Sequence, residues 1–241
     1  MKSPGQRIVW ITGAGSGIGK ASAEYFASAG DHIIATARTK SKLRDVKNHS
    51  TASGGVCDVF VCDVRDQKSI TRVSNKILKT YHTVDVLVNN AGITSFNSFL
   101  ETPEKIFKDI VATNLLGTYL VTRAVLPSMI KQKKGLILNV ISYAAKEVFK
   151  NSAAYSASKS GTAAMMKVLR EEVRSEGIKI INVYPGAVAT AIWHPGVQEK
   201  YKGKMLKAEE IAKTLYQLTL QPELLMVEEV TLRPQQGNLT L

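Results

Sequence analysis

Tyr155 and Lys159 stand four residues apart in the stretch AYSASK, residues 154–159. On a helix of 3.6 residues per turn, the two side chains lie on one face and can reach each other. A free tyrosine has a pKa of about 10, and a nearby positive charge lowers that pKa because it favours the phenolate. The pair therefore suggests a proton donor and acceptor, although surface packing produces the same spacing in many helices.

A glycine-rich turn gives a second chemical signal. In WITGAGSGIGKA (10–21), four glycines at alternate positions from 13 to 19 follow an apolar run and precede a helical pattern. Residues without a Cβ allow backbone N–H groups to approach a pyrophosphate at a helix N-terminus. A plain turn is the alternative, but its place after the first strand favours a dinucleotide site. The spacing T-G-x-x-x-G-x-G differs from the common G-x-G-x-x-G, because Ile18 stands where a glycine would be.

Alternating segments must position these groups. Continuous apolar runs rich in β-branched residues are typical of strands buried on both faces of a parallel sheet. Stretches of helical spacing separate them, and this alternation indicates a doubly wound sheet. We predict a single-domain α/β Rossmann fold over 1–241, with a mostly parallel seven-stranded sheet and helices on both faces. The expected strands are 7–12, 32–37, 56–62, 84–89, 135–140, 178–184 and 226–232, and the expected helices are 17–29, 66–80, 103–131, 153–176 and 208–220.

Composition excludes several classes of protein. The 241 residues are 44% hydrophobic and 22% charged, and no run approaches the roughly 18 apolar residues of a membrane span. The N-terminal stretch does not have the pattern of a signal peptide, so we expect a cytoplasmic protein without a membrane partner. Cys57 and Cys62, five apart on a strand, should point to opposite faces as core residues. The four histidines show no metal-ligand spacing, and we predict no metal.

The net charge of +12 raises the question of an anionic partner. Lysines and arginines crowd 38–47, 131–134 and 200–207. Nucleic-acid binding is one interpretation, but these stretches lack interleaved aromatic residues and a recognisable nucleic-acid motif. We therefore expect a solvated basic surface and no nucleic acid, with a field that anionic cofactors or substrates would feel.

Four motifs in order carry a resemblance to a known family. TGAGSGIG (12–19), NNAG (89–92), YSASK (155–159) and PGAVAT (185–190) occur at separations that resemble those of the short-chain dehydrogenase/reductase family, in its compact one-domain type. The resemblance spans nearly the whole chain. It implies an oxidoreductase that uses a nicotinamide cofactor, and it suggests a homotetramer or homodimer.

The resemblance also implies a catalytic tetrad of Asn114, Ser142, Tyr155 and Lys159. Ser142 lies thirteen residues before Tyr155, the spacing seen in the family, and its hydroxyl would hold a carbonyl oxygen. Asn114 falls inside the helix expected over 103–131. Either it is a tolerated polar residue, or it marks a kink whose freed carbonyl binds a water in a proton relay to Lys159.

Cofactor choice depends on the end of the second expected strand. Where NAD-binding relatives place an acid for the adenosine ribose, this chain has Ala37, and Arg38 follows. A guanidinium would bind a 2′-phosphate, whereas a carboxylate would repel it. We predict NADP(H), against the alternative that Arg38 merely faces solvent.

Other cofactor contacts follow from the motifs by resemblance. The family places an acid and an apolar residue beside the adenine ring, small residues after the fourth strand, and a carboxamide site after the sixth. The expected cofactor-binding residues are Gly13, Ser16, Gly17, Ile18, Gly19, Arg38, Asp63, Val64, Asn90, Ala91, Gly92, Tyr155, Lys159, Pro185, Gly186, Val188 and Thr190.

Substrate identity is less constrained. A segment over about 190–207 usually covers the substrate in this family, although an ordinary surface segment is an equal alternative. We expect Trp193 to line the substrate site with Ser142 and Tyr155, Tyr201 to offer a second aromatic wall, and Phe96, Tyr143 and Phe149 to add apolar walls. Lys146 and Lys150 flank the same region and could attract an acidic substrate.

Two functions remain open from the sequence. One is an NADP-dependent enzyme that transfers a hydride to or from a small carbonyl or secondary alcohol, with Tyr155 as general acid and base. The other is a non-catalytic NADPH-binding sensor or regulator that uses the basic surface.

Overall fold

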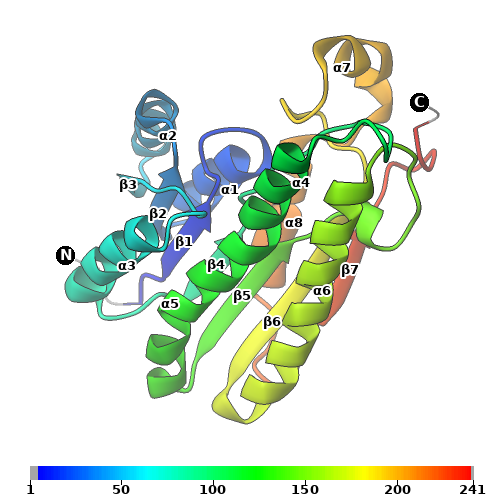
Figure 1. The fold of residues 1–241 in the computed structure, drawn as a ribbon. Helices are drawn as coiled ribbons and strands as arrows, with labels where there is room; N and C mark the ends of the chain where they lie inside the picture. The colour runs from blue at the N-terminus through cyan, green and yellow to red at the C-terminus, as the bar shows by residue number, and fades with distance from the viewer. Residues whose placement is uncertain (1–4, 240–241) are drawn as a thin grey trace.

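A parallel sheet forms the centre of the molecule. The computed structural model describes residues 5–239. Within them, seven strands pair in the order β3-β2-β1-β4-β5-β6-β7, all parallel, as Figure 1 shows. The Rossmann-type fold is therefore confirmed. The strands are β1 Ile8–Thr12, β2 His32–Ala37, β3 Val56–Val61, β4 Val86–Asn89, β5 Gly135–Val140, β6 Ile178–Pro185 and β7 Glu229–Leu232.

Helices cover both faces of this sheet. α1, α2 and α8 contribute to one apolar cluster, and α3, α5 and α6 contribute to the other. The short α7 lies beyond the sheet at the end where the strands terminate (Figure 1). The helices are α1 Gly17–Ser28, α2 Lys40–Ala52, α3 Gln67–Tyr81, α4 Glu104–Val111, α5 Gly117–Gln132, α6 Ala153–Val173, α7 Pro195–Tyr201 and α8 Ala208–Leu218.

β1 illustrates why the strands are continuously apolar. Val9 and Ile11 belong to the first cluster, whereas Ile8 and Trp10 belong to the second. Successive side chains of a strand point to opposite faces, so a strand covered on both sides is apolar at most positions, and a polar side chain there needs a buried hydrogen-bond partner. Cys57 and Cys62 are free, buried and divided between the two clusters, as expected for core residues.

Two helices lie where none was expected. α2 occupies most of the basic stretch 38–47 and extends to Ala52. It buries Leu43, Val46 and Ser50, at the spacing of one helical face, and its other positions are mostly polar. α7 lies inside the segment 190–207. β7 is also shorter than the expected run 226–232.

A row of three asparagines links β4, β5 and β6. Asn89 pairs with Asn139, and Asn139 pairs with Asn182, in the register of the sheet. Asn89 donates to the Asn139 side chain at 3.0 Å, and Asn139 donates to the Asn182 side chain at 3.0 Å. All three are buried. Their hydrogen bonds offset the cost of burying most of these polar groups, although Asn89 Oδ1 has no hydrogen-bond partner among the described residues, and they hold the three strands in one register.

The longest helical run has the composition of a membrane span but packs as a core helix. Residues Glu104–Gln132 are long and apolar enough to cross a membrane, judged by length and composition alone. Val121, Val125 and Met129 of this run are buried in the cluster on the sheet. Buried core helices often have this length and composition, so these two properties alone do not indicate a membrane span.

Candidate active site

One cleft of about 560 Å³ lies over the carboxyl ends of the strands. Its walls come mainly from the segments after β1, β2, β3, β4, β5 and β6, together with the start of α6. β2 and β3 follow β1 on one side of it, and the chain then crosses to place β4 on the other side, so the strand order changes direction at β1. Ligands of open α/β sheets bind at this switch in strand order.

The glycine turn is shaped for close backbone approach. Gly13 has φ +65°, and a Cβ there would lie 2.7 Å from the Cα of Ala91. A Cβ on Gly19 would collide with the Gly13 carbonyl and the Asn90 side chain. These positions therefore accept only glycine, and the turn after β1 packs directly against the turn after β4.

The N-terminus of α1 is open to an anion. Ser16 precedes the helix, and its side chain caps no backbone N–H group. The first N–H groups of a helix have no partner within the helix, and they carry its positive dipole end. Gly17 lies beside Thr190, whose methyl carbon would be 3.0 Å from a Cβ on that glycine. Gly15, Ser16, Gly17 and Ile18 line the cleft, and this cradle fits the pyrophosphate of a dinucleotide.

Two cations lie near the end of β2. Arg38 lines the cleft as expected, and Lys42 of α2 lines it as well. The Cβ atoms of Ala37 and Lys42 are each 3.3 Å from the position that a Cβ on Gly15 would take. Lys42 was missed from the sequence because α2 was missed. The small Ala37 leaves room where an acid would repel a phosphate.

Asp63 is already engaged by a neighbouring residue. Arg65 binds its carboxylate, with Nη2 2.8 Å from Oδ2, and also pairs with Asp109 of α4 at 3.3 Å. The Arg65 guanidinium lowers the pKa of Asp63. Asp63 and Val64 both line the cleft, and their contacts with adenine stay a prediction, in which Asp63 would share its carboxylate with Arg65.

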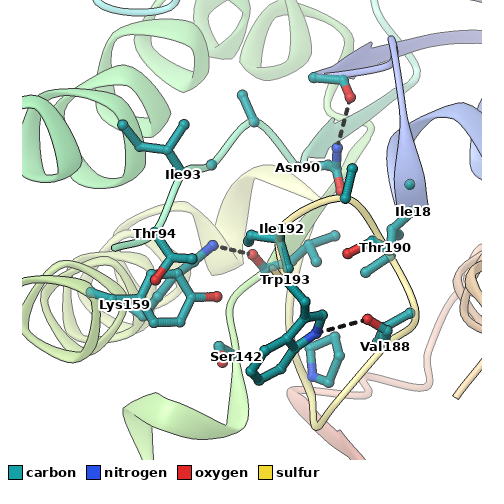
Figure 2. A pocket seen from close by; sticks show the side chains of 18 of the residues that line it. Ile18, Asn90, Ile93, Thr94, Ser142, Lys159, Val188, Thr190, Ile192 and Trp193 are labelled. Atoms are coloured by element: carbon teal, nitrogen blue, oxygen red, sulfur yellow. Dashed lines mark hydrogen bonds between the residues drawn. The ribbon is translucent and has the colours of Figure 1, made fainter. Parts of the chain in front are cut away.

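The turn after β4 joins the glycine turn to the catalytic candidates. Asn90 donates its side-chain amide to the carbonyls of Thr12 and Gly13, at 3.0 and 3.2 Å. It therefore braces the two turns as well as lining the cleft (Figure 2). A Cβ on Gly92 would lie 3.3 Å from Asn114 Oδ1 and 3.5 Å from Lys159 Nζ.

Tyr155 and Lys159 lie on one face of α6, as the spacing predicts. Lys159 is only 6% exposed, and its ammonium donates to the Val140 carbonyl at 2.8 Å. That ammonium lies 5.8 Å from the centre of the Tyr155 ring. Burial lowers the pKa of Lys159 to about 8. The charged ammonium loses its hydration in the interior, so the neutral amine is favoured relative to water.

The sequence predicts a lowered pKa for Tyr155, and this prediction is wrong for the protein without its cofactor. Burial raises the pKa of Tyr155, and hydrogen bonding with Ser142 opposes that rise only in part. The reason is that the phenolate would be formed in a partly dry site, and the Lys159 ammonium is directed to the Val140 carbonyl.

Asn114 lies in a π-helical turn, Ala112–Leu116, between α4 and α5. The Gly117 N–H bonds to the Ala112 carbonyl, five residues back. The Asn114 side chain accepts from the Ile93 N–H and donates to the Ile93 carbonyl, both at 2.9 Å. The interrupted helix is thus present, and it ties Asn114 to the loop after β4.

The backbone carbonyl of Asn114 is bonded to side chains. Thr118 and Thr162 hydroxyls lie 2.8 and 3.1 Å from it. The Asn114 amide also donates to the Ser158 hydroxyl at 3.0 Å. A water at this carbonyl would compete with the two threonines, and the relay to Lys159 stays a prediction.

Ser142 follows β5 and lines the cleft with Tyr155. Its hydroxyl accepts from the Ala144 N–H at 3.1 Å, which fixes the oxygen at the start of a short 3₁₀ turn, Tyr143–Ala145. Pro185, Gly186, Val188 and Thr190 complete the wall after β6. Val188 is held by an isolated bridge to Leu206.

Aromatic side chains line the part of the cleft where the sequence predicts the substrate. Trp193 donates its indole N–H to the Val188 carbonyl at 3.0 Å, and Figure 2 shows this bond in the wall opposite Lys159. Phe96, Tyr143 and Phe149 line the cleft as expected. Tyr201 is buried and is not among the described residues that line it, so that expectation was wrong.

Comparison with known proteins assigns the class. The sequence profile of the short chain dehydrogenase family matches residues 7–200. A sepiapterin reductase from Chlorobaculum tepidum is 34% identical over 241 residues, which cover 97% of this chain and 98% of the relative. This chain therefore belongs to the short-chain dehydrogenase family of oxidoreductases, as the motifs indicate.

Solved structures agree with this assignment. A metagenomic short-chain oxidoreductase in complex with NADP is 31% identical, with a TM-score of 0.84, over 95% of this chain and 97% of that one. A variant of actinorhodin polyketide ketoreductase with NADPH is 28% identical, with a TM-score of 0.90, over 99% and 100% of the two chains. The fold of these proteins extends over nearly all of this chain.

Proposed function

We propose that this protein is an NADP-dependent reductase that transfers a hydride between NADP(H) and a carbonyl or secondary alcohol. One observation carries the proposal. A single cleft runs from the glycine turn and Arg38 to Ser142, Tyr155 and Lys159. The open N-terminus of α1 suits a pyrophosphate, and Arg38 with Lys42 suits a 2′-phosphate. Similar proteins of known structure bind NADP or NADPH.

The chain's own residues supply the proton chemistry. When bound, NADPH supplies the hydride. Tyr155 donates its phenolic proton to the carbonyl oxygen, and the Ser142 hydroxyl holds that oxygen while charge develops on it. Lys159 provides a positive charge on the same helix face, which stabilises the phenolate that remains. Asn114 positions this group through Ser158 and the loop at Ile93.

The remaining motif residues hold the cofactor in this proposal. Those lining the cleft orient its phosphates, its adenosine and its nicotinamide, so that the reacting carbon meets the substrate. They are Gly13, Ser16, Gly17, Ile18, Asp63, Val64, Asn90, Ala91, Gly92, Pro185, Gly186, Val188 and Thr190. Gly19 is not among the described residues that line the cleft. Its lack of a side chain leaves space for the Gly13 carbonyl and the Asn90 side chain, and so supports the shape of the turn.

We further propose that residues 1–241 form one domain, with the segment 190–207 covering the substrate. Residues Thr190, Ala191, Ile192 and Trp193 of that segment line the cleft, which supports this role. A cytoplasmic location, a homotetramer or homodimer, and the absence of a membrane, metal or nucleic-acid partner stay predictions from the sequence.

The test is NADPH oxidation with a panel of aldehydes, ketones and β-keto esters, with NADH in parallel. We expect turnover with NADPH, little with NADH, and loss of turnover in Tyr155→Phe with NADPH binding retained. The alternative is a non-catalytic sensor. It would gain support if NADPH bound tightly and no carbonyl compound were reduced, or if turnover did not depend on Tyr155.

A further inference from the structure

Lys150 is an exposed lysine in the turn before α6. It lines the same cleft as Ser142 and Tyr155. Within residues 5–239, no hydrogen bond or ion pair engages this ammonium. A cation without a protein partner at the edge of a binding site is available to a ligand.

The other cations in this region have protein partners. Arg233 lies 4.4 Å over the Tyr143 ring and donates to the Asn238 side chain at 3.1 Å. Lys146, four residues earlier, pairs with Glu229 at 2.8 Å, lies 4.0 Å above the Tyr184 ring and is outside the described lining of the cleft. Lys159 is buried and donates to a backbone carbonyl. Arg38 and Lys42 lie at the opposite end, beside the glycine turn. The structure therefore separates the two lysines that the sequence left equivalent.

The turn that carries Lys150 is well anchored. The Ser152 hydroxyl donates to the Phe149 carbonyl at 2.6 Å. This bond joins the residues before and after the turn that contains Lys150. Asn151 adopts φ 61°, a left-handed conformation that asparagine tolerates. The Phe149 ring packs edge-on against Tyr143, with centroids 6.4 Å apart. Because Tyr143 directly follows Ser142, these contacts hold Lys150 close to the catalytic candidates.

Negative charge is scarce in the cleft. Among the described residues that line it, Asp63 is the one acid, and Arg65 binds its carboxylate. Glu147 lines a neighbouring hollow and accepts a hydrogen bond from the Val148 N–H. A cationic substrate would thus find no free carboxylate beside the aromatic walls, whereas an anionic one would find Lys150.

We propose that Lys150 binds an anionic group of the substrate, and that the substrate class is an apolar carbonyl compound bearing a carboxylate. The inference rests on the proposed reductase function of the same site. The aromatic wall of Phe96, Phe149 and Trp193 takes the apolar body. Lys150 takes the carboxylate at the rim, and the carbonyl faces Ser142 and Tyr155. The net charge of +12 adds a field that favours the approach of anions.

The experiment compares matched substrates that differ in one charge. NADPH oxidation is followed with 2-, 3- and 4-carboxybenzaldehyde and with the corresponding methyl esters. We expect kcat/KM to favour at least one acid over its ester by about fivefold, the range of a partly exposed ion pair. The preference should shrink as salt is added, because the ion pair is screened.

Lys150→Met is the decisive variant, and Lys146→Met is its control. Both variants lose one positive charge from the same loop, but only Lys150 lines the cleft. We expect Lys150→Met to lower kcat/KM for the acid more than for the ester, so that the preference is lost, and Lys146→Met to keep the preference. An equal rate for acid and ester in the wild type, or a preference that survives in Lys150→Met, would overturn the inference.

A binding measurement separates this inference from the proposed function. Benzoate and benzamide differ by one charge, and their binding can be followed through the fluorescence of Trp193 at the cleft. If the aldehyde group is reduced neither in the acids nor in their methyl esters, nor any compound of the wider carbonyl panel, the reductase proposal fails. A preference for benzoate that Lys150→Met removes would still support the anion site, and equal binding of the two would overturn it.

Discussion

Phe96 and Trp193 stack against each other at the substrate end of the cleft, with ring centroids 5.3 Å apart and planes 10° from parallel. Phe96 belongs to the loop after β4, and Trp193 belongs to the segment after β6. The two segments are therefore joined over the cleft by an aromatic contact as well as by packing. Aromatic pairs of this kind contribute about 0.5–1.5 kcal/mol beyond their buried area.

Removing the indole should weaken substrate binding. In Trp193→Ala, we expect KM for an aromatic aldehyde to rise by about tenfold, since both the pair and a wall of the cleft are lost. Trp193→Phe is the matched control, because it keeps a ring for Phe96 and loses only the N–H bond to Val188. Steady-state kinetics of the two variants give the result. An unchanged KM in Trp193→Ala would mean that the pair does not contact substrate.

Cofactor preference should depend on two basic residues. Arg38→Asp should raise the dissociation constant of NADPH by about tenfold or more, because a charge-assisted bond to the 2′-phosphate becomes a repulsion. Lys42→Ala should weaken NADPH binding to a lesser extent, and neither change should weaken NADH. Arg44→Ala is the control, since Arg44 lies on α2 but is not among the described residues lining the cleft. Titration of both nucleotides, followed by fluorescence, checks this, and equal losses for NADPH and NADH would contradict it.

The buried charge of Lys159 should lower the free energy of unfolding of the protein, although the proposed reaction depends on this residue. Its pKa falls from 10.5 to about 8 on folding, so the unfolded chain binds the proton more tightly between these values. The charged form therefore disfavours folding by roughly 3 kcal/mol at pH 7, and this penalty disappears as pH rises through about 8 to above 10.5. Lys159→Met should be inactive but more stable at pH 7, by about 1–3 kcal/mol after the lost bond to Val140 is included.

Urea unfolding of wild type and Lys159→Met at several pH values measures this difference. We expect the stability gain of the variant to be largest below pH 8 and to vanish near pH 10.5. A gain that does not depend on pH would show that the effect comes from packing. A loss of stability at pH 7 would mean that Lys159 is not penalised by burial.

The asparagine row should contribute strongly to stability. Asn139→Ala removes one of the two acceptors of the Asn89 amide, which keeps Thr122, and it removes the donor to the Asn182 side-chain oxygen, while both residues stay buried. We expect a loss of about 2–4 kcal/mol in the free energy of unfolding. Asn48→Ala, on the exposed side of α2, should change it by less than about 0.5 kcal/mol. Thermal or urea unfolding distinguishes them, and similar values for both would show that the row does not stabilise the sheet.

Burial explains how much of the fold was predictable. β2 and β5 have the bounds expected from sequence, because a strand covered on both faces is a mostly apolar run, interrupted here only by single polar residues such as Thr36 and Asn139. α2 was missed because Leu43 and Val46 are its only apolar contacts with the core, among basic residues that read as a solvated surface. A helix with so few buried positions has almost no periodic signal.

The site was predictable to the extent that its chemistry is local. Tyr155 and Lys159 are four residues apart on one helix, and the glycine turn lies within a short stretch, so each motif could be read directly. Lys42 and the stacking of Phe96 on Trp193 depend on where distant segments meet. The raised pKa of Tyr155 was also beyond sequence, because desolvation is a property of the folded surroundings.

The π-helical turn at Ala112–Leu116 sets an angular offset between α4 and α5. Each residue of an α-helix advances the direction of its side chain by about 100°, so one additional residue in a turn rotates everything before it relative to everything after it. With that offset, α5 faces the sheet through Val121 and Val125 while Asn114 faces Ile93. Deleting one residue between Asn114 and α5 would restore a regular helix, so Asn114 could no longer bond to Ile93 while Val121 and Val125 pack on the sheet.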